Sequence, residues 1–274
     1  MRLIKPSFTI IEQQSGLDGL YKQIELAGRT CYKSEDKITP TSAKEFADRM
    51  IKSGHGAMLE HGTVYLDIPN SAGNYNLVPF FASNPYSKVV IKPLDDRVHN
   101  YITTNFRVIV ENFAEEYIPD VLQYICEPTE FHEKRISVRW TCDRGVSHEF
   151  VRHRVFSFAQ ESTRYCNYSK DKFGHEITYI QPCLEMQKDE EELFLLQLEQ
   201  AQNAYNALIS SGWKPQQARA ILPNALKTEL VMTGFESDWK HFFELRCDTA
   251  AHPDARKLAL ELYNKLYNKE YGKE

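Results

Sequence analysis

The sequence predicts an α+β fold in a single elaborated domain. Segments with a helical spacing of apolar residues alternate with shorter segments in which apolar and polar residues alternate strictly, as in half-buried strands. A chain of 274 residues with 42% hydrophobic residues can bury a sizeable core and lies near the upper size for one compact domain. Because the chain has no internal repeat, linker or low-complexity tract, we treat residues 1–274 as one domain.

The residue pattern of the amino-terminal part predicts two helices followed by a strand. Residues 15–28 carry apolar side chains at helical spacing after a capping serine, and Gly28 should end this helix. Residues 29–34 are then expected to form a loop. Residues 42–54 begin with a serine and a glutamate in capping-box spacing and end in a glycine. Residues 63–68 alternate between apolar and polar, which predicts a strand.

Residues from about 70 to 135 form an extended segment with mixed signals. It contains the turn-prone run NSAGN, the β-rich run RVIV at 107–110 and a helix expected around 119–125. We interpret this extended segment as an elaboration of a smaller core.

The rest of the chain predicts strands and long helices. A strand at 136–141 should lead through a turn at 143–145 to a helix that places His148 and Arg152 four residues apart on one face. Further elements are expected as a strand at 176–181, a long helix at 188–212, and a helix capped by Ser237 that carries His241 and Arg246.

Bulk properties exclude several classes of protein. The net charge of −5 argues against nucleic acid as the main partner, because such proteins normally carry a basic excess. We see no amino-terminal signal and no apolar run long enough to cross a bilayer, so we expect a cytoplasmic protein without membrane contact. The six cysteines never form a CxxC pair, and we expect neither disulfides nor a zinc ribbon.

The most informative stretch is RHRVFSFAQESTRY at residues 152–165. Guanidinium groups bind phosphate oxygens bidentately, while hydroxyl and amide groups bind the polar edges of a base. Basic clusters on protein surfaces are often only solvated, but the apolar residues threaded through this run favour the wall of a pocket.

This stretch resembles the RHR-x7-S signature of the flavin-dependent thymidylate synthases. The surrounding sequence is similar to that family in the same order. His55 and the Glu60-His61 pair lie upstream, and ARAILP at 218–223 and LRCDTAAHPDAR at 245–256 lie downstream. The resemblance covers most of the chain apart from the extended segment.

The resemblance implies a set of binding residues. Implied FAD contacts are His55, Ala57 through its backbone, Arg152, His153, Arg154, Gln160 and His241. Implied contacts with deoxyuridylate (dUMP) are Glu149, Arg152, Gln160, Glu161, Ser162, Thr163, Arg164, Arg219 and Arg246. The family role of the arginine matching Arg246 is catalytic, because it favours ionisation of the uracil N3 position, and a permanently charged donor suits this role.

The implied reaction is reductive methylation of dUMP to thymidylate, with methylenetetrahydrofolate as carbon donor and NADPH as reductant of FAD. The resemblance also implies a homotetramer whose sites combine residues from several subunits. The resemblance gives Cys166 no role as a nucleophile. For Ser162, binding or polarisation of the substrate is a better role than nucleophilic attack.

Two alternative functions remain at this point. A nucleotide phosphohydrolase would need a metal-binding acidic cluster, which we do not find, and His55 with Glu60-His61 lacks a third ligand, so we expect no metal. A non-enzymatic nucleotide- or RNA-binding module could use the same basic loop, although the acidic net charge disfavours it.

Overall fold

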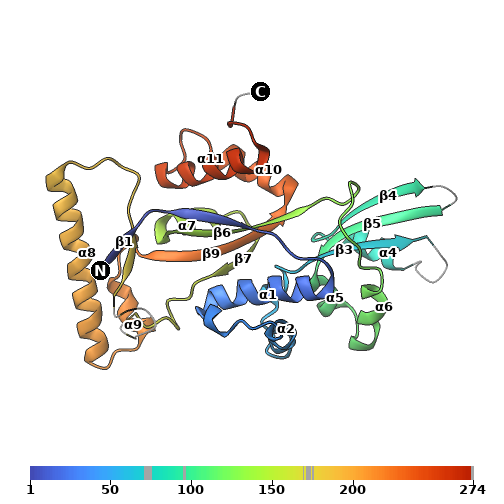
Figure 1. Cartoon of the computed structure of the whole chain (residues 1–274), viewed down its shortest axis with the longest axis horizontal. Helices are drawn as coiled ribbons and strands as arrows, with labels where there is room; N and C mark the ends of the chain where they lie inside the picture. Colours follow the sequence, from blue (N-terminus) through green and yellow to red (C-terminus); the bar gives the residue numbers. More distant parts are fainter. Residues whose placement is uncertain (71–75, 95–96, 169, 171–173, 175, 273–274) are drawn as a thin grey trace.

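The structure confirms the α+β class, with mixed sheets and helices in one body (Figure 1). It is a computed structural model that describes residues 1–70, 76–94, 97–168, 170, 174 and 176–272. Most of the NSAGN run therefore lies outside the described residues. Helices α10 and α11 lie on one side of a central sheet, and α1 and α2 lie on the other (Figure 1).

The described strands of the central sheet run in the order β2-β6-β9-β7, and every neighbouring pair is antiparallel. These strands are β2 (Ser7–Ile11), β6 (Arg135–Asp143), β9 (Lys227–Phe235) and β7 (Ser157–Gln160). The strand expected at 136–141 is confirmed as β6, where Val138 and Trp140 are fully buried. Strand β7, which lies within the RHR-x7-S signature, is at the edge of this sheet.

One face of the central sheet packs against an aromatic core. Helices α7 (Arg144–Phe150), α10 (Glu236–Arg246) and α11 (Pro253–Tyr267) cover this face. Trp140 contacts Phe150, Trp239 and Phe242 with ring centroids 4.8, 6.3 and 6.0 Å away. This aromatic packing holds α10, which carries His241 and Arg246, against the strands.

The opposite face packs against α1 (Gly16–Tyr32), α2 (Ser42–Lys52) and the short α3 (Gly56–Leu59). The expected end of the first helix at Gly28 is wrong, because the helix continues to Tyr32 and ends where Lys33 adopts a left-handed conformation. Gly28 instead allows the Phe46 ring to pack closely against α1, since a Cβ at this position would lie 2.4 Å from that ring.

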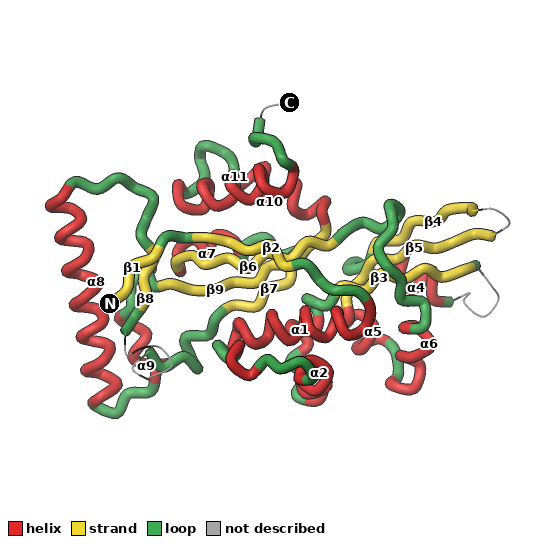
Figure 2. The backbone as a smooth tube through the Cα atoms, in the orientation of Figure 1, coloured by secondary structure: helices red, strands yellow, loops and turns green. Residues whose placement is uncertain are grey.

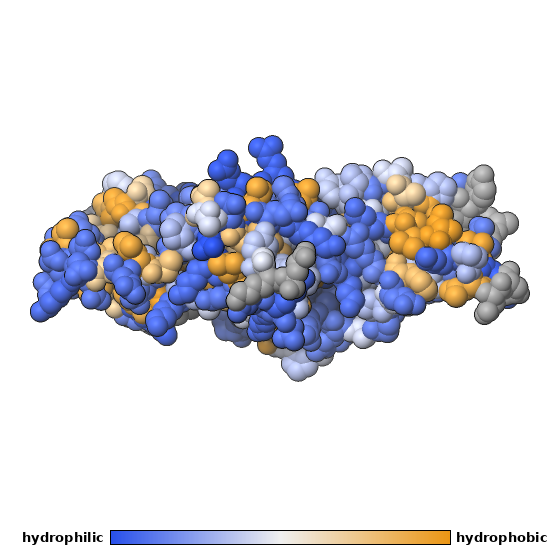
Figure 3. Space-filling view, turned by 90° about the horizontal axis from the view of Figure 1, so that it is seen from above, coloured by the Kyte–Doolittle hydropathy of each residue, from blue (hydrophilic) through white to orange (hydrophobic). Residues whose placement is uncertain are grey.

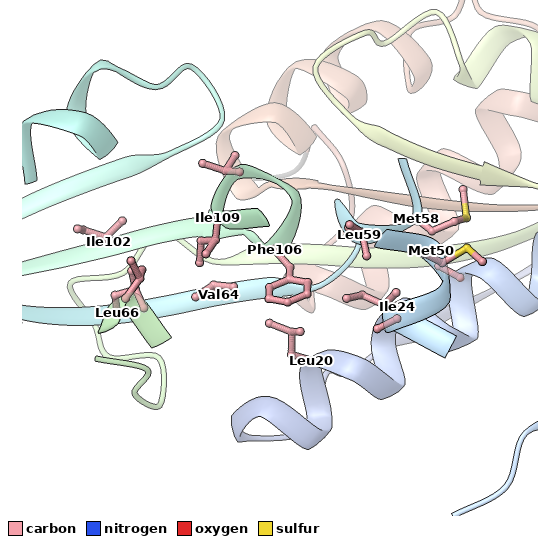
Figure 4. Packing of buried hydrophobic residues seen from close by; sticks show 14 of the residues in the cluster. Leu20, Ile24, Met50, Met58, Leu59, Val64, Leu66, Ile102, Phe106 and Ile109 are labelled. Atoms are coloured by element: carbon pink, nitrogen blue, oxygen red, sulfur yellow. The ribbon is translucent and has the colours of Figure 1, made fainter. Parts of the chain in front are cut away.

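The extended segment forms much of a second sheet with the strand order β3-β5-β4 among the described residues (Figures 1 and 2). This sheet contains β3 (Thr63–Pro69), which precedes the extended segment, and β4 (Lys88–Leu94) and β5 (Arg97–Asn105) within it. The extended segment also forms the helices α4 (Leu77–Ser83), α5 (Phe106–Asn112) and α6 (Ile118–Leu122). Its core is continuous with that of α1, because Leu20 and Ile24 gather with Val64 and Phe106 (Figure 4).

The β-rich run at 107–110 lies in a helix, so the expectation of a strand there is wrong. The Asn105 side chain accepts a hydrogen bond from the backbone nitrogen of Val108 at 3.2 Å and caps α5. Val108 and Ile109 then bury their side chains in the core. The helix expected near 119–125 is confirmed as α6, although it ends at Leu122.

The far end of the molecule holds α8 (Lys188–Ser210), with the strand pair β1 (Arg2–Ile4) and β8 (Thr178–Ile180) and the short α9 (Pro215–Ala218) (Figure 2). The long helix is confirmed, and it buries Leu198 and Tyr205.

Three helix boundaries differ from expectation, at the two ends of α7 and at the start of α10. The Asp143 carboxylate accepts a hydrogen bond from the Val146 nitrogen at 2.8 Å, so α7 begins at Arg144 without the expected turn. Helix α7 ends at Phe150, and Arg152 therefore lies beyond the helix instead of sharing a face with His148. Ser237 lies inside the first turn of α10, whose N-cap is Phe235.

Candidate functional site

Arg246 is fixed by contacts with the segment that carries the basic signature. Its Nε donates to Nε2 of His153 at 2.9 Å, and its Nη2 donates to the backbone oxygen of Glu149 at 2.7 Å. Its Nη1 forms an ion pair with the Glu149 carboxylate. Because three separate acceptors hold the planar guanidinium, its orientation is set before any ligand arrives.

His153 is a neutral side chain within this arrangement. It is 7% exposed, and its ring lies 5.0 Å from that of Phe242. Burial, followed by the positive charge of Arg246, lowers the pKa of His153 to about 4. Since Nε2 accepts a hydrogen bond from Arg246, the proton of the neutral ring is assigned to Nδ1.

These side chains line an open pocket of about 750 Å³, which we call the signature pocket. Arg152 and Arg154 both reach it, are exposed, and make no ion pair with the described residues. His241 also lines it, with its ring 6.4 Å from that of His153. Two free guanidinium groups beside a neutral imidazole suit the phosphates of a dinucleotide such as FAD, so these residues fit the implied cofactor.

A second group of expected residues lies beyond the other end of β7. Arg219 donates from Nη1 to Oγ1 of Thr163 at 2.8 Å, and the Arg164 nitrogen donates to Oγ of Ser162 at 3.3 Å. The Ser162 nitrogen donates to the backbone oxygen of Cys31 at 3.0 Å, which fixes this loop against the end of α1. We call Ser162, Thr163, Arg164 and Arg219 the loop cluster.

Two tyrosines, Tyr32 and Tyr165, link His55 to the loop cluster. The His55 Nδ1 is 2.9 Å from the Tyr32 hydroxyl, and the Tyr32 ring lies 5.8 Å from the Tyr165 ring. Ala57 is exposed in α3, two residues from His55. Neither His55 nor Ala57 lines the signature pocket, so one chain divides the expected cofactor contacts between two places.

Gln160 and Glu161 are held by interactions inside the protein. Gln160 donates from Nε2 to the hydroxyls of Ser147 at 2.8 Å and Thr228 at 3.3 Å. Glu161 is 3% exposed and forms an ion pair with Lys227 at 2.8 Å. Both side chains are therefore engaged within the protein.

The charges beneath the loop cluster form a continuous network. Glu229 binds Lys227 at 2.7 Å and Lys33 at 2.8 Å, and all three side chains are largely buried. Burial alone would raise the pKa of Glu229, but the two ammonium groups outweigh it and lower that pKa to about 2. Sequence analysis missed this network, although Lys227 and Glu229 are two residues apart in a strand and therefore share a face.

The thiol of Cys166 is poorly suited to covalent catalysis. It is 2% exposed, and burial, with a smaller contribution from Glu161, raises its pKa to about 12. A thiol with this pKa remains protonated at neutral pH, whereas a nucleophilic cysteine needs a thiolate.

The histidine and glutamate considered as metal ligands have other partners. Glu60 forms an ion pair with Arg107 at 2.6 Å, and His61 Nδ1 lies 2.8 Å from the Thr233 hydroxyl. Burial lowers the pKa of His61 to about 3. The described part of the chain has no cluster of three or more side chains that could hold a metal ion.

The site combines a fixed arginine, a neutral histidine and exposed cations, and this set of groups suits a ligand that carries phosphate. Comparison with known sequences then identifies the family. Residues 90–269 match the family described as thymidylate synthase complementing protein, and the chain belongs to it. This match begins inside the extended segment.

Relatives named flavin-dependent thymidylate synthase occur in several organisms. The Geobacter sulfurreducens protein is 34% identical over 119 residues, which are 43% of this chain and 50% of that protein. The Pyrococcus furiosus protein is 32% identical over 162 residues, 58% of this chain and 65% of that one. The match therefore spans about half to two thirds of these relatives. The Corynebacterium glutamicum protein is 23% identical over 272 residues, 93% of this chain and 78% of that one.

A similar solved structure is the UMP/dUMP methylase PolB from Streptomyces cacaoi bound with 5-Br dUMP. It shares 15% identity, with a TM-score of 0.46, over 98% of this chain and 93% of that one. No helix in the described ranges is long and apolar enough to span a membrane, and all six cysteines are free.

Proposed function

We propose that this protein is an FAD-dependent methyltransferase that converts dUMP to thymidylate, with methylenetetrahydrofolate as carbon donor and NADPH as reductant. The observation that carries the proposal is the arrangement of Arg246, Glu149 and His153 in the signature pocket, beside the free cations Arg152 and Arg154. The names of the relatives support the same reaction.

Arg246 stabilises negative charge on the uracil ring. Its contacts with Glu149 and His153 use one hydrogen of each guanidinium nitrogen, so each terminal nitrogen keeps one N–H for substrate. As uracil N3 loses its proton, this fixed cation favours the anion without having to reorient. The neutral state of His153 keeps a second positive charge away from Arg246.

Bound flavin supplies the redox chemistry of the proposed reaction, and the protein supplies orientation and electrostatics. Arg152 and Arg154 bind its phosphates, while the buried His153 fixes the turn that carries both. In the loop cluster, Arg164 and Arg219 bind the phosphate of dUMP. Ser162 positions the nucleotide through its hydroxyl and backbone and takes no part as a nucleophile.

A homotetramer completes this site in our proposal. Within one chain the signature pocket and the loop cluster lie at opposite ends of β7, and we propose that a partner's loop cluster meets each signature pocket. Figure 3 shows hydrophobic side chains gathered at the end of the molecule that holds β4 and β5, where Ile91 is 59% exposed. Such patches often mark protein interfaces. We also propose a cytoplasmic location, with which free thiols are consistent.

The test is an assay of purified protein. We expect a yellow protein whose released flavin is FAD, and thymidylate formation that requires dUMP, methylenetetrahydrofolate and NADPH together. Light scattering should give the mass of four chains. Absence of flavin and of thymidylate would refute the proposal, and release of phosphate from dUMP would favour the phosphohydrolase instead.

A further inference from the structure

A second pocket lies between the central sheet and the extended segment. This pocket of about 680 Å³ is lined by β7 and the end of β9 on one side, and by Tyr86 and Lys88 of the extended segment on the other. We call it the segment pocket. Arg154 and Val155 line both the segment pocket and the signature pocket, so a ligand that crosses this turn can occupy both.

The segment pocket has an excess of uncompensated positive charge. Lys88 and Arg154 make no ion pair with the described residues. Arg135 is largely buried, and its side-chain hydrogen bonds go to neutral oxygens, including the Glu60 backbone oxygen at 2.9 Å. Two acidic groups line the pocket. Glu60 is already neutralised by Arg107, and Asp238, which interacts with Lys88 and Arg135, leaves the three cations in excess over one carboxylate. An anionic ligand is therefore favoured.

Aromatic side chains accompany these cations. The Tyr86 side chain is 60% exposed at the mouth of the segment pocket, and Phe235 lies under the Lys88 ammonium group at 5.5 Å. The turn that presents Tyr86 and Lys88 is fixed to β5, because Ser87 donates to the Thr104 hydroxyl at 2.8 Å. An exposed aromatic face beside cations on a fixed turn suits a planar base joined to a phosphate.

We propose that the segment pocket binds the adenosine phosphate half of FAD and that Tyr86 and Lys88, supplied by the extended segment, are binding residues for it. This inference rests on the proposed function. The diphosphate crosses Arg154, which both pockets share, and the flavin half occupies the signature pocket with dUMP. Each pocket has a volume in the usual range for a ligand site, and an extended dinucleotide can reach from one to the other across Arg154.

The experiment compares flavins that differ only in the adenosine phosphate half. Full-length wild type, Tyr86→Ala and Lys88→Ala are freed of flavin by dialysis and titrated with FAD and FMN, with flavin fluorescence as the signal. Lys92→Ala is the matched control, because Lys92 lies in the same strand but packs over Phe131, outside the segment pocket. Both test positions are exposed, so the fold should tolerate the changes.

We expect each test variant to raise the Kd for FAD about tenfold and to leave the Kd for FMN unchanged, since one charged contact or one stacked base is lost. The control should match wild type for both flavins. Unchanged FAD binding in both variants, or equal weakening of FAD and FMN, would overturn the inference. So would an effect confined to the KM for NADPH, which would assign the pocket to the reductant.

The two proposals fail in different ways. If wild type binds FAD and forms thymidylate while the variants behave like wild type, only the role of the segment pocket is lost. If wild type binds no flavin, the proposed function fails and this inference fails with it.

Discussion

Replacement of Arg246 by lysine tests the proposed chemistry most directly. Arg246→Lys keeps a positive charge but removes the planar group that contacts His153 and Glu149 simultaneously. A lysine ammonium cannot span acceptors on both residues while still presenting two parallel donors to a ligand. The charge remains, but its fixed direction is lost.

The expected effect is large because the Arg246 side chain is only 12% exposed. One well-placed donor to a developing anion contributes about 3 to 4 kcal/mol, which is a factor of about 10² to 10³ in kcat. We expect thymidylate formation at saturating dUMP to fall by this factor. Flavin content should stay near that of wild type, because Arg152 and Arg154 remain in place.

The assay measures the thymidylate rate beside flavin absorbance across a range of pH. If Arg246 favours ionisation of uracil N3, raising the pH should partly restore the lysine variant, because the base then ionises without help. A merely structural role would lower the melting temperature and flavin content together, with no such recovery. Near-wild-type turnover in the lysine variant would refute our reasoning.

Three further predictions concern other groups. The pKa of His153 is lowered from 6.5 to about 4, so the stability that its neutral form provides is complete above pH 6.5 and is lost as pH falls toward 4. Flavin retention should fall over the same range in a dialysis assay, and His153→Ala should weaken retention at pH 7; an unchanged flavin content would contradict its role. Cys166→Ala should keep thymidylate formation, because a thiol with a pKa of about 12 is protonated, and loss of turnover in a folded, ligand-binding variant would require covalent catalysis. Glu229→Gln should destabilise the protein by about 3 kcal/mol in urea denaturation, because Lys33 loses a largely buried partner, while Lys44→Ala in an exposed ion pair should leave the midpoint almost unchanged. The Glu229 contribution is complete above its ordinary pKa of 4.5 and is lost as pH falls toward 2, so equal effects of the two variants at pH 7 would refute it.

The sequence by itself determined the elements with strong local patterns. Alternation of apolar residues predicted β6, and an acidic start followed by an apolar stripe predicted α8. The basic signature and its flanking motifs led to the family to which the chain belongs. These features depend on residues within a few helical turns or one strand, so they can be recognised in the sequence without the rest of the molecule.

Local patterns misled where packing between distant segments decided the outcome. Gly28 has the features of a helix end, but α1 continues past it to Tyr32, and the Phe46 ring occupies the space that the glycine leaves. The run at 107–110 has high strand propensity, yet the Asn105 cap and the burial of Val108 stabilise a helix there. Tertiary contacts outweighed intrinsic propensity at both positions.

Only the tertiary structure placed the groups of the candidate site relative to one another. Arg246 is 93 residues from His153 and 97 from Glu149, and the aromatic packing of α10 against the central sheet brings them into contact. The same applies to Glu161 and Lys227, which are 66 residues apart but form one buried ion pair. A sequence specifies which charges are present. Their approach depends on how helices and strands pack across the whole chain, because hydrogen bonds and ion pairs act over only a few ångströms.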